Sequence, residues 1–466
     1  MGSLKKLLSV ALSIAILAVG TATAFAAEYD GDEEDEDVHH IHSESGKTVE
    51  IERHGSSLPE RRVSHDNKTP VMGSSDNDTR KSLFKKAYKV RVQWDVVPGA
   101  VSYELALMRG KENIPKNIIT RYREIYTNGT EIDLSGFGEE KADFYWKVRP
   151  MDFDRNGIEG YSTPAPITIG VPDADAPEPT TEYEKMQLSS LYPVYSWIPY
   201  LNARSYEIKV YSEDLTGSAK CIRTLYSTSM DKYDDAGYTS PGAYFWRVRA
   251  LNGYGKPISS WSRKAYFRVT RPVNVAALGD SITHGGGAVS VPPGYRLYDW
   301  ESYCDIPVKN LGFSGNTVAD MNERFSRDVL PFAPRILVIM GGVNDYRNGT
   351  DAWTIINGLE SLRSKCRANG IIPVFLTVTP LNPDLIAKCG FINMPPSDWG
   401  TQLQIVNQWV MSQKYCIDIT SALADYRGWM ENAITTDGLH PDFIGKKYIG
   451  ERVASYLHAN FAEIVQ

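Results

Sequence analysis

The chain has 466 residues, of which 42% are hydrophobic and 23% are charged, and its formal net charge is −7. This length exceeds one ordinary hydrophobic core, so two to four globular domains are expected. The acidic balance, with no basic stripe interleaved with aromatic residues, excludes a typical nucleic-acid-binding protein, whose affinity depends on Lys and Arg meeting phosphates.

Residues 1–26 have the pattern of a signal peptide. Lys5 and Lys6 precede an apolar run at residues 7–19, and the small residues at 24 and 26 suit a signal peptidase. An uncleaved membrane anchor is the alternative, but the apolar run is short for a membrane-spanning helix. We therefore expect a secreted, bacterial protein with no stable membrane span after cleavage, and attachment to the cell surface is compatible with this.

Residues 27–85 form an acidic segment with few large apolar side chains, which is typical of disorder. His39, His40 and His42 lie beside its most acidic part, and a solvated linker is favoured there over a metal-binding tail. The five cysteines show no paired C-x-x-C spacing, so no zinc or redox site is expected. Their disulfide pairing is left open, and the odd number leaves at least one free thiol.

Two stretches of the chain repeat one aromatic pattern. Trp94 and Trp197 each precede a Tyr-Glu pair by nine residues. Later in each stretch, Tyr-Trp-Lys-Val-Arg at 145–149 corresponds to Phe-Trp-Arg-Val-Arg at 245–249. The shared order and spacing indicate an internal duplication of one structural unit.

Apolar residues alternate with polar ones inside each repeat, for example at 102–107 and 205–210, as in a strand with one buried face. Short strands separated by Gly, Asn and Asp turns predict an all-β sandwich. The repeats, at residues 86–172 and 183–270, resemble fibronectin type III domains. Their tryptophans are expected in the sandwich cores, with sugar-stacking platforms as the alternative.

Residues 272–466 change to strands that alternate with helices. The pattern predicts a three-layer α/β domain with a doubly wound, five-stranded parallel sheet of flavodoxin-like type. Helical spacing is clearest at residues 353–366 and 444–457. The apolar runs expected to form the strands are 273–278, 306–311, 336–340, 371–378 and 415–419. Active sites in such sheets lie at the carboxyl ends of the strands.

Four short polar segments are expected at those strand ends. They are residues 279–283, 310–317, 341–345 and 437–441. Ser281 follows the first strand, but a serine hydroxyl is a poor nucleophile until a base removes its proton. His440 is a natural general base near neutral pH, and Asp437 can hold its Nδ1–H.

In this order, the four segments resemble those of the SGNH, or GDSL, hydrolase family over the whole of this domain. The resemblance implies that Ser281 is the nucleophile, His440 the base and acid, and Asp437 its orienting partner. It also implies an oxyanion hole formed by the backbone N–H groups of Ser281 and Gly315 and by the side chain of Asn344. It implies no metal and no cofactor.

Three polar residues beside these segments compete for a role. Asp280 is not expected to be the triad acid, and Asp345 is expected to fix its loop. His284 is expected at the surface or behind the site, with a place in the leaving-group pocket as the alternative.

The resulting hypothesis is a secreted serine esterase that deacetylates a carbohydrate. Tandem sandwiches favour contact with a cell wall or polysaccharide. Tyr295, Tyr298 and Trp300 are expected to stack on sugar rings, although a segment packed by its own aromatic side chains fits the pattern equally well. Two other hypotheses stay open: a lipid or lysophospholipid acylhydrolase with an acyl pocket at residues 381–396, and a surface- or glycan-binding protein that acts through the sandwiches.

Overall fold

The computed structural model describes residues 89–137, 143–167, 175–287, 291–391 and 394–465. All of them belong to one compact unit of the chain, Glu44–Gln466. The expected signal peptide and acidic segment lie outside the described residues. Within the described ranges, no helix combines the length and the apolar character needed to cross a bilayer.

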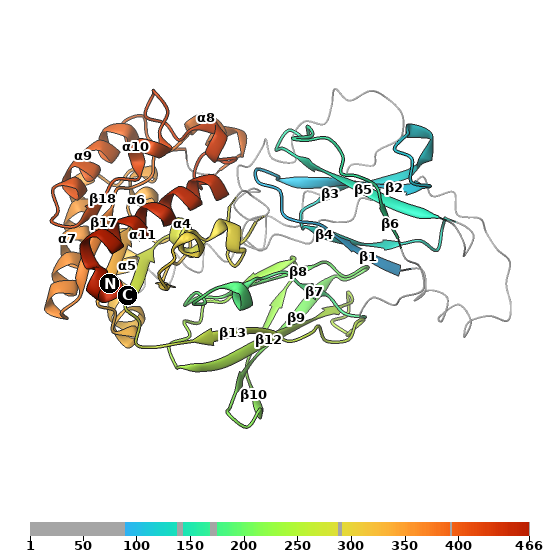
Figure 1. Ribbon diagram of the computed structural model, residues 1–466, viewed down its shortest axis with the longest axis horizontal. Helices are drawn as coiled ribbons and strands as arrows, with labels where there is room; N and C mark the ends of the chain where they lie inside the picture. Colours follow the sequence, from blue (N-terminus) through green and yellow to red (C-terminus); the bar gives the residue numbers. More distant parts are fainter. Residues whose placement is uncertain (1–88, 138–142, 168–174, 288–290, 392–393, 466) are drawn as a thin grey trace. The chain divides into compact units, whose positions relative to one another are not determined.

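The first repeat folds into two antiparallel sheets (Figure 1). One sheet pairs β1 with β4, and the other has the strand order β3-β2-β5-β6. The elements are β1 (Lys89–Gln93), β2 (Ser102–Arg109), η1 (Pro115–Asn117), β3 (Ile118–Ile125), β4 (Gly129–Asp133), β5 (Phe144–Met151) and β6 (Ala165–Pro166). Trp94 and Trp146 are half-buried and pack against the core of this sandwich.

The second repeat has the same two-sheet architecture, with strand orders β11-β8-β7 and β10-β9-β12-β13. Its elements are β7 (Glu178–Pro179), η2 (Tyr183–Lys185), β8 (Val194–Ile198), β9 (Ser205–Glu213), β10 (Ala219–Ser227), β11 (Asp231–Tyr233), β12 (Gly242–Leu251) and β13 (Ala265–Val269). Trp197 and Trp246 are buried with their ring centroids 6.4 Å apart. The tryptophans of both repeats therefore belong to the cores, as predicted, and the fibronectin type III resemblance stays a prediction.

The C-terminal domain contains the predicted five-stranded sheet, in the order β15-β14-β16-β17-β18. All four strand pairings are parallel. The strands are β14 (Val275–Gly279), β15 (Val308–Asn310), β16 (Ile336–Met340), β17 (Ile372–Leu376) and β18 (Cys416–Ile417). Each lies inside an apolar run expected to form a strand or overlaps one. The order reverses at β14, and ligands of doubly wound sheets bind at such a switch point.

Helices flank this sheet (Figure 1). They are α4 (Ser281–His284), α5 (Val318–Asp328), α6 (Val343–Arg347), α7 (Ala352–Ala368), α8 (Pro383–Lys388), α9 (Trp399–Met411), α10 (Thr420–Leu423) and α11 (Phe443–Val465), with short 3-10 turns η3 (Arg296–Tyr298), η4 (Trp300–Tyr303), η5 (Leu330–Phe332) and η6 (Asn432–Ile434). Helix α7 packs between α5 and α9, while α11 packs on η3 and η4. The long amphipathic helices at α7 and α11 were expected from their spacing.

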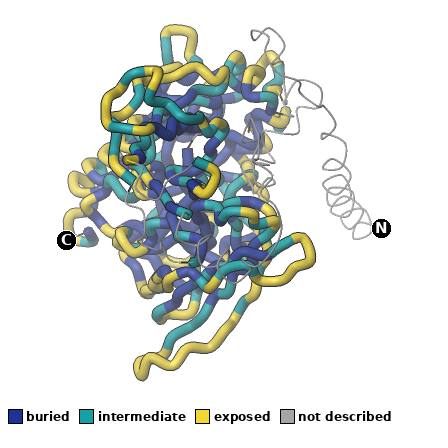
Figure 2. Tube along the Cα trace, turned by 90° about the vertical axis from the view of Figure 1, so that its right-hand side faces the viewer, coloured by how far each residue is buried: buried dark blue, intermediate teal, exposed yellow. Residues whose placement is uncertain are grey.

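Buried apolar side chains of the described residues form three clusters. The largest joins the second sandwich and the C-terminal domain and also includes Val101 of the first sandwich. The other core residues of the first sandwich form a cluster of their own, and a small third cluster lies at residues 291–298. Figure 2 shows the buried residues gathered inside the chain trace and the exposed residues mainly at its periphery. The second sandwich is thus packed into the same core as the sheet that carries the candidate site.

Candidate active site

Ser281 lies at a tight turn between strand β14 and helix α4. Asp280 caps this helix, because its Oδ1 accepts a hydrogen bond of 2.9 Å from the N–H of Ile282. A side chain at Gly279 would collide with Thr283 and with the carbonyl of Met340, so the turn requires a glycine there. The first polar segment therefore projects from the carboxyl end of a central strand, and Ser281 itself is partly exposed.

His440 links Ser281 to Asp437. The Nε2 atom of His440 is 2.9 Å from the Oγ atom of Ser281, and its Nδ1 atom is 3.0 Å from Oδ2 of Asp437. An ionised carboxylate can only accept, so Nδ1 carries the proton and Nε2 presents its lone pair to the serine hydroxyl. His440 is therefore within hydrogen-bond reach of both residues with which it was expected to act.

The turn before α11 holds the imidazole and the carboxylate in place. Asp437 is fully buried, and its Oδ1 accepts from the backbone N–H groups of Leu439 at 2.7 Å and of His440 at 2.8 Å. Gly438 has a φ of +78°, and a side chain there would collide with the carbonyl of Asn382. Three hydrogen bonds to one carboxylate fix its orientation toward the ring.

The second polar segment packs on helix α4. The N–H of Phe313 donates to the carbonyl of Gly279 at 3.1 Å, and the side-chain amide of Asn310 donates to the carbonyl of Thr283 at 2.5 Å. Gly315 is exposed, has a φ of +84°, and has open space where a Cβ atom would stand. A backbone with this freedom lets a ligand come close to the chain.

Asn344 is the second residue of helix α6 and lies near this loop. Its Nδ2 atom donates to the carbonyl of Asn316 at 3.0 Å, which uses one of the two N–H groups of the amide. Asp345 accepts from the N–H of Val318 at 3.0 Å and so fixes the start of α5, rather than only its own loop. Gly279 and Met340 are register partners, so Ser281 and Asn344 follow adjacent strand ends.

A buried arginine, Arg324 of helix α5, joins these segments and was not identified from the sequence. Its guanidinium donates to the carbonyls of Gly279 at 2.9 Å and Leu311 at 2.7 Å, and to Oδ1 of Asn316 at 2.5 Å. Asp328 supplies the countercharge at 3.2 Å. The only sequence signal was a charged residue on an amphipathic helix, and this pattern normally indicates a solvated side chain.

The sugar-stacking prediction is wrong for the three aromatic residues to which it was assigned. Tyr298 and Trp300 are 0% exposed, and Tyr295 is 7% exposed. Tyr295 and Tyr298 pack with Val291 in a small core of their own, and Trp300 belongs to the main core. No ring face is therefore open to a sugar, and the alternative of a segment packed by its own aromatic side chains describes these residues.

Buried charges lie beneath the site. Burial, together with the nearby Asp345, raises the pKa of Asp280 to about 7. Lys446 of helix α11 is also buried, and its Nζ donates to the carbonyl of Ile282 at 2.7 Å. Desolvation lowers the pKa of Lys446 to about 8, although Asp299 and Glu301 oppose that shift. This lysine is the countercharge for the carboxylates around α4.

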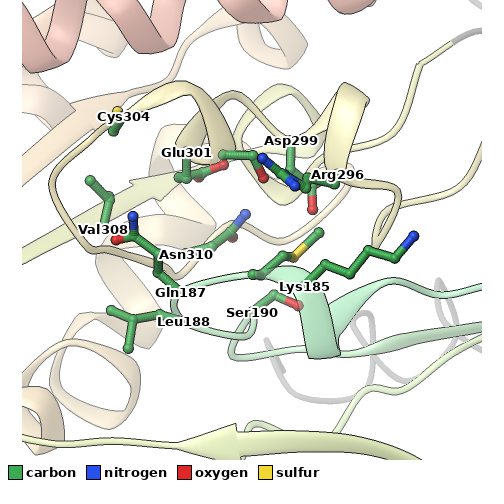
Figure 3. A pocket seen from close by; sticks show the side chains of 12 residues that line it. Lys185, Gln187, Leu188, Ser190, Arg296, Asp299, Glu301, Cys304, Val308 and Asn310 are labelled. Atoms are coloured by element: carbon green, nitrogen blue, oxygen red, sulfur yellow. The ribbon is translucent and has the colours of Figure 1, made fainter.

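A cavity of about 80 Å³ is lined by residues 185–188 and Ser190 together with side chains from the segment of residues 296–310 (Figure 3). Asp299 and Glu301 lie among its lining side chains. Burial raises the pKa of Asp299 to about 7, and burial together with Asp299 raises the pKa of Glu301 well above its usual value. Ser281, Asp437 and His440 do not line this cavity, so it is separate from the candidate catalytic residues.

Comparison with known proteins gives the following matches. Residues 277–447 match the model of a family described as GDSL-like lipase/acylhydrolase. No curated protein matches the chain. Similar solved structures include the lipase/acylhydrolase from Enterococcus faecalis (21% identity, 40% of this chain and 96% of that chain, TM-score 0.34) and a GDSL-like lipase from Bacteroides thetaiotaomicron VPI-5482 (17%, 41% and 92%, 0.32). A catalytic mutant of an acetylxylan esterase from Geobacillus stearothermophilus is also similar (18%, 41% and 95%, 0.30).

Proposed function

We propose that this chain is a secreted serine esterase which deacetylates a carbohydrate. The proposal starts from its C-terminal domain, which belongs to the GDSL-like lipase/acylhydrolase family and hydrolyses ester bonds. The observation that carries the proposal is the 2.9 Å separation between Ser281 Oγ and His440 Nε2. It is the distance over which a general base takes a proton from a nucleophile.

The reaction begins when His440 Nε2 takes the hydroxyl proton of Ser281 as Oγ attacks the ester carbonyl. The imidazolium that forms is stabilised by Asp437, which is held against Nδ1. His440 then returns the proton to the leaving alkoxide, and an acyl group stays on Ser281. Water, activated by the same imidazole, releases the carboxylic acid in the second half of the reaction.

Negative charge develops on the carbonyl oxygen in each half. We assign its stabilisation to the N–H groups of Ser281 and Gly315 and to the side-chain amide of Asn344. Support comes from the exposed, open backbone at Gly315 and from the bond that holds Asn344 beside the same loop. Loss of one such donor typically costs about 3 kcal/mol of transition-state stabilisation, a hundredfold or more in rate.

The acyl group is proposed to be short. In the segment of residues 381–396, Ile386 is 0% exposed and Phe391 is 4% exposed, whereas Met394 is 47% exposed. Side chains already packed in the core are poorly placed to line a long acyl pocket, and this favours acetate over a lipid acyl chain. The carbohydrate part rests on the signal-peptide pattern and the tandem sandwiches.

Acetate release from acetylated xylan tests the whole proposal. Wild-type protein is expected to release acetate, Ser281→Ala to lose at least about a thousandfold in rate, and Ser412→Ala, at an exposed serine after α9, to match wild type. Acetate release that survives Ser281→Ala would contradict the assigned nucleophile. A series of nitrophenyl esters separates the acyl classes, because a maximum at eight carbons or more would favour the lipid alternative.

Glycan binding by the sandwiches is a second candidate, favoured by exposed aromatic rings on the second one. Tyr226 is 60% exposed and Tyr254 is 90% exposed. The full chain carrying Ser281→Ala should sediment with insoluble xylan, and a further Tyr226→Ala and Tyr254→Ala change should release it. Equal sedimentation of both proteins would show that these two rings do not bind the glycan.

A further inference from the structure

His284 connects the second sandwich to the loop that contains Gly315. Its Nε2 atom is 2.7 Å from the backbone carbonyl oxygen of Tyr192, which can only accept. Nε2 therefore carries the hydrogen. The Nδ1 atom of the neutral ring is then an acceptor, and the hydroxyl and N–H of Ser314 donate to it at 2.9 and 3.3 Å.

This imidazole is enclosed. His284 is 2% exposed, its ring stacks on Phe313 with centroids 6.3 Å apart, and the ring of Tyr233 meets its plane at 76°. The ring of Tyr192 packs edge-on against Phe313 with centroids 4.7 Å apart. A buried ring with both nitrogen atoms bonded transmits the position of one chain segment to another, because neither nitrogen can shift without losing a bond.

Tyr192 also reaches the loop by a second route, through its hydroxyl. That hydroxyl donates to Oδ2 of Asp328 at 2.7 Å, and Asp328 pairs with Arg324. Arg324 in turn donates to the carbonyl of Leu311 and to Oδ1 of Asn316, at the two ends of the loop. One residue of the second sandwich thus supports both the middle and the ends of this loop.

The chain segment around Tyr192 is itself tied to strand β15, from which the loop emerges. The N–H of Leu191 donates to the carbonyl of Asn310 at 2.8 Å. The buried Lys309 donates to the carbonyl of Ser189 at 2.7 Å. These two hydrogen bonds, at the adjacent residues Lys309 and Asn310, fix the position of the sandwich segment relative to strand β15. The position of Tyr192 is therefore fixed as well.

We propose that His284 and Tyr192 are positioning residues that hold the loop of residues 311–316 against Ser281, which makes the second sandwich a working part of the esterase site. The inference rests on the proposed function, because the loop matters for catalysis through the N–H of Gly315. Ser314 directly precedes Gly315, so its bonds to His284 set where that N–H points. A donor displaced by about 1 Å from a developing charge can cost up to a hundredfold in rate.

Steady-state kinetics of the full chain on nitrophenyl acetate test the proposal. His284→Ala is expected to lower kcat by about 10- to 100-fold with KM within twofold of wild type, since a misplaced oxyanion donor acts on the transition state. His284→Asn, whose carbonyl oxygen can replace the Nδ1 acceptor, should recover part of that loss. Tyr192→Phe removes only the hydroxyl and should lower kcat by less than His284→Ala.

The control is His458→Ala, at an exposed histidine paired with Asp305, which should match wild type. An unchanged kcat in His284→Ala would overturn the proposal. A lower kcat in His284→Ala would also overturn the proposal under two joint conditions. The first is that His284→Asn does not reduce the loss, and the second is that the loss appears only when the variant unfolds at the assay temperature.

Hydrogen exchange gives a readout that does not need a substrate. Amides of residues 311–316 should exchange at least about tenfold faster in His284→Ala than in wild type, and at the wild-type rate in Ser281→Ala. Unchanged exchange in His284→Ala would reject the positioning role. Faster exchange in a chain that hydrolyses no ester would uphold the contact and reject the proposed function, so the two failures are distinguishable.

Discussion

The two sandwiches repeat the same interior bonds, and yet they are packed differently. In the first, the hydroxyl of Tyr103 accepts from the N–H of Val97 at 2.9 Å; in the second, the hydroxyl of Tyr206 accepts from the N–H of Tyr200 at 2.8 Å. Such matched side-chain bonds in two distant segments indicate that one local sequence pattern specifies one local structure.

The difference lies in what covers each core. Trp94 stays half-buried in a cluster confined to the first sandwich, whereas Trp197 is 0% exposed in a cluster that continues into the C-terminal domain. The sequence of a repeat therefore determines the fold of that repeat. How deeply its core tryptophan is buried depends in addition on the neighbouring domain. The first sandwich should behave as an addition to the molecule and the second as part of its catalytic unit.

The largest expected effect separates the two equivalent tryptophans. Trp197→Ala should lower the free energy of unfolding by about 3–5 kcal/mol, the usual cost of removing a fully buried large side chain. It should also lower the temperature at which the esterase is inactivated, because the two domains share a core. Trp94→Ala should cost less and leave that temperature unchanged.

Denaturant unfolding followed by circular dichroism, with residual ester hydrolysis in parallel, makes the measurement. Equal inactivation of the two variants would refute the idea that only the second sandwich belongs to the catalytic unit.

A lysine at the boundary provides the next prediction. Lys309 is 0% exposed, and burial lowers its pKa to about 7. Between about pH 7 and its normal pKa near 10.5, the unfolded chain binds a proton at this lysine that the folded chain does not. Stability from this group therefore rises with pH across that window, by at most about 1.4 kcal/mol per pH unit.

Lys309→Met should remove this rise. Unfolding free energies at pH 7, 8 and 9 are expected to diverge from wild type as pH increases, with the wild type gaining. Lys185→Met, at an exposed lysine of the second sandwich, is the control and should give a difference that is constant with pH. Parallel curves for Lys309→Met and wild type would mean that the buried lysine stays charged.

Much of the candidate site could be predicted from short stretches of sequence. The run at residues 336–340 is strand β16 itself, and Ser281 comes two residues after strand β14, which overlaps its predicted run. Local patterns suffice for these features, because strand burial and turn chemistry depend on residues close together in the chain. The resemblance of the polar segments, in their order, to those of the SGNH hydrolase family then implied that Asp437 and His440 act with Ser281.

Contacts between the second sandwich and the C-terminal domain could not be predicted. His284 and Tyr192 are 92 residues apart, and no spacing indicates that a ring nitrogen meets that carbonyl. For the same reason, Tyr298 and Trp300 were expected to be open to sugars. A pattern identifies an apolar side chain, but the segments that cover it are known only from the fold.

The smallest expected effect concerns the polar link between the first sandwich and the C-terminal domain. Lys388 of α8 forms an ion pair with Asp154, and the two side chains are 41% and 49% exposed. Exposed pairs of this kind contribute about 0–1 kcal/mol, because water and salt screen them. Lys388→Ala should therefore shift the melting temperature by no more than a few degrees, with ester hydrolysis unchanged, as calorimetry and nitrophenyl acetate kinetics can establish. A loss as large as that of Trp197→Ala would mean that the first sandwich is also part of the catalytic unit, because an ion pair this exposed could not by itself produce it.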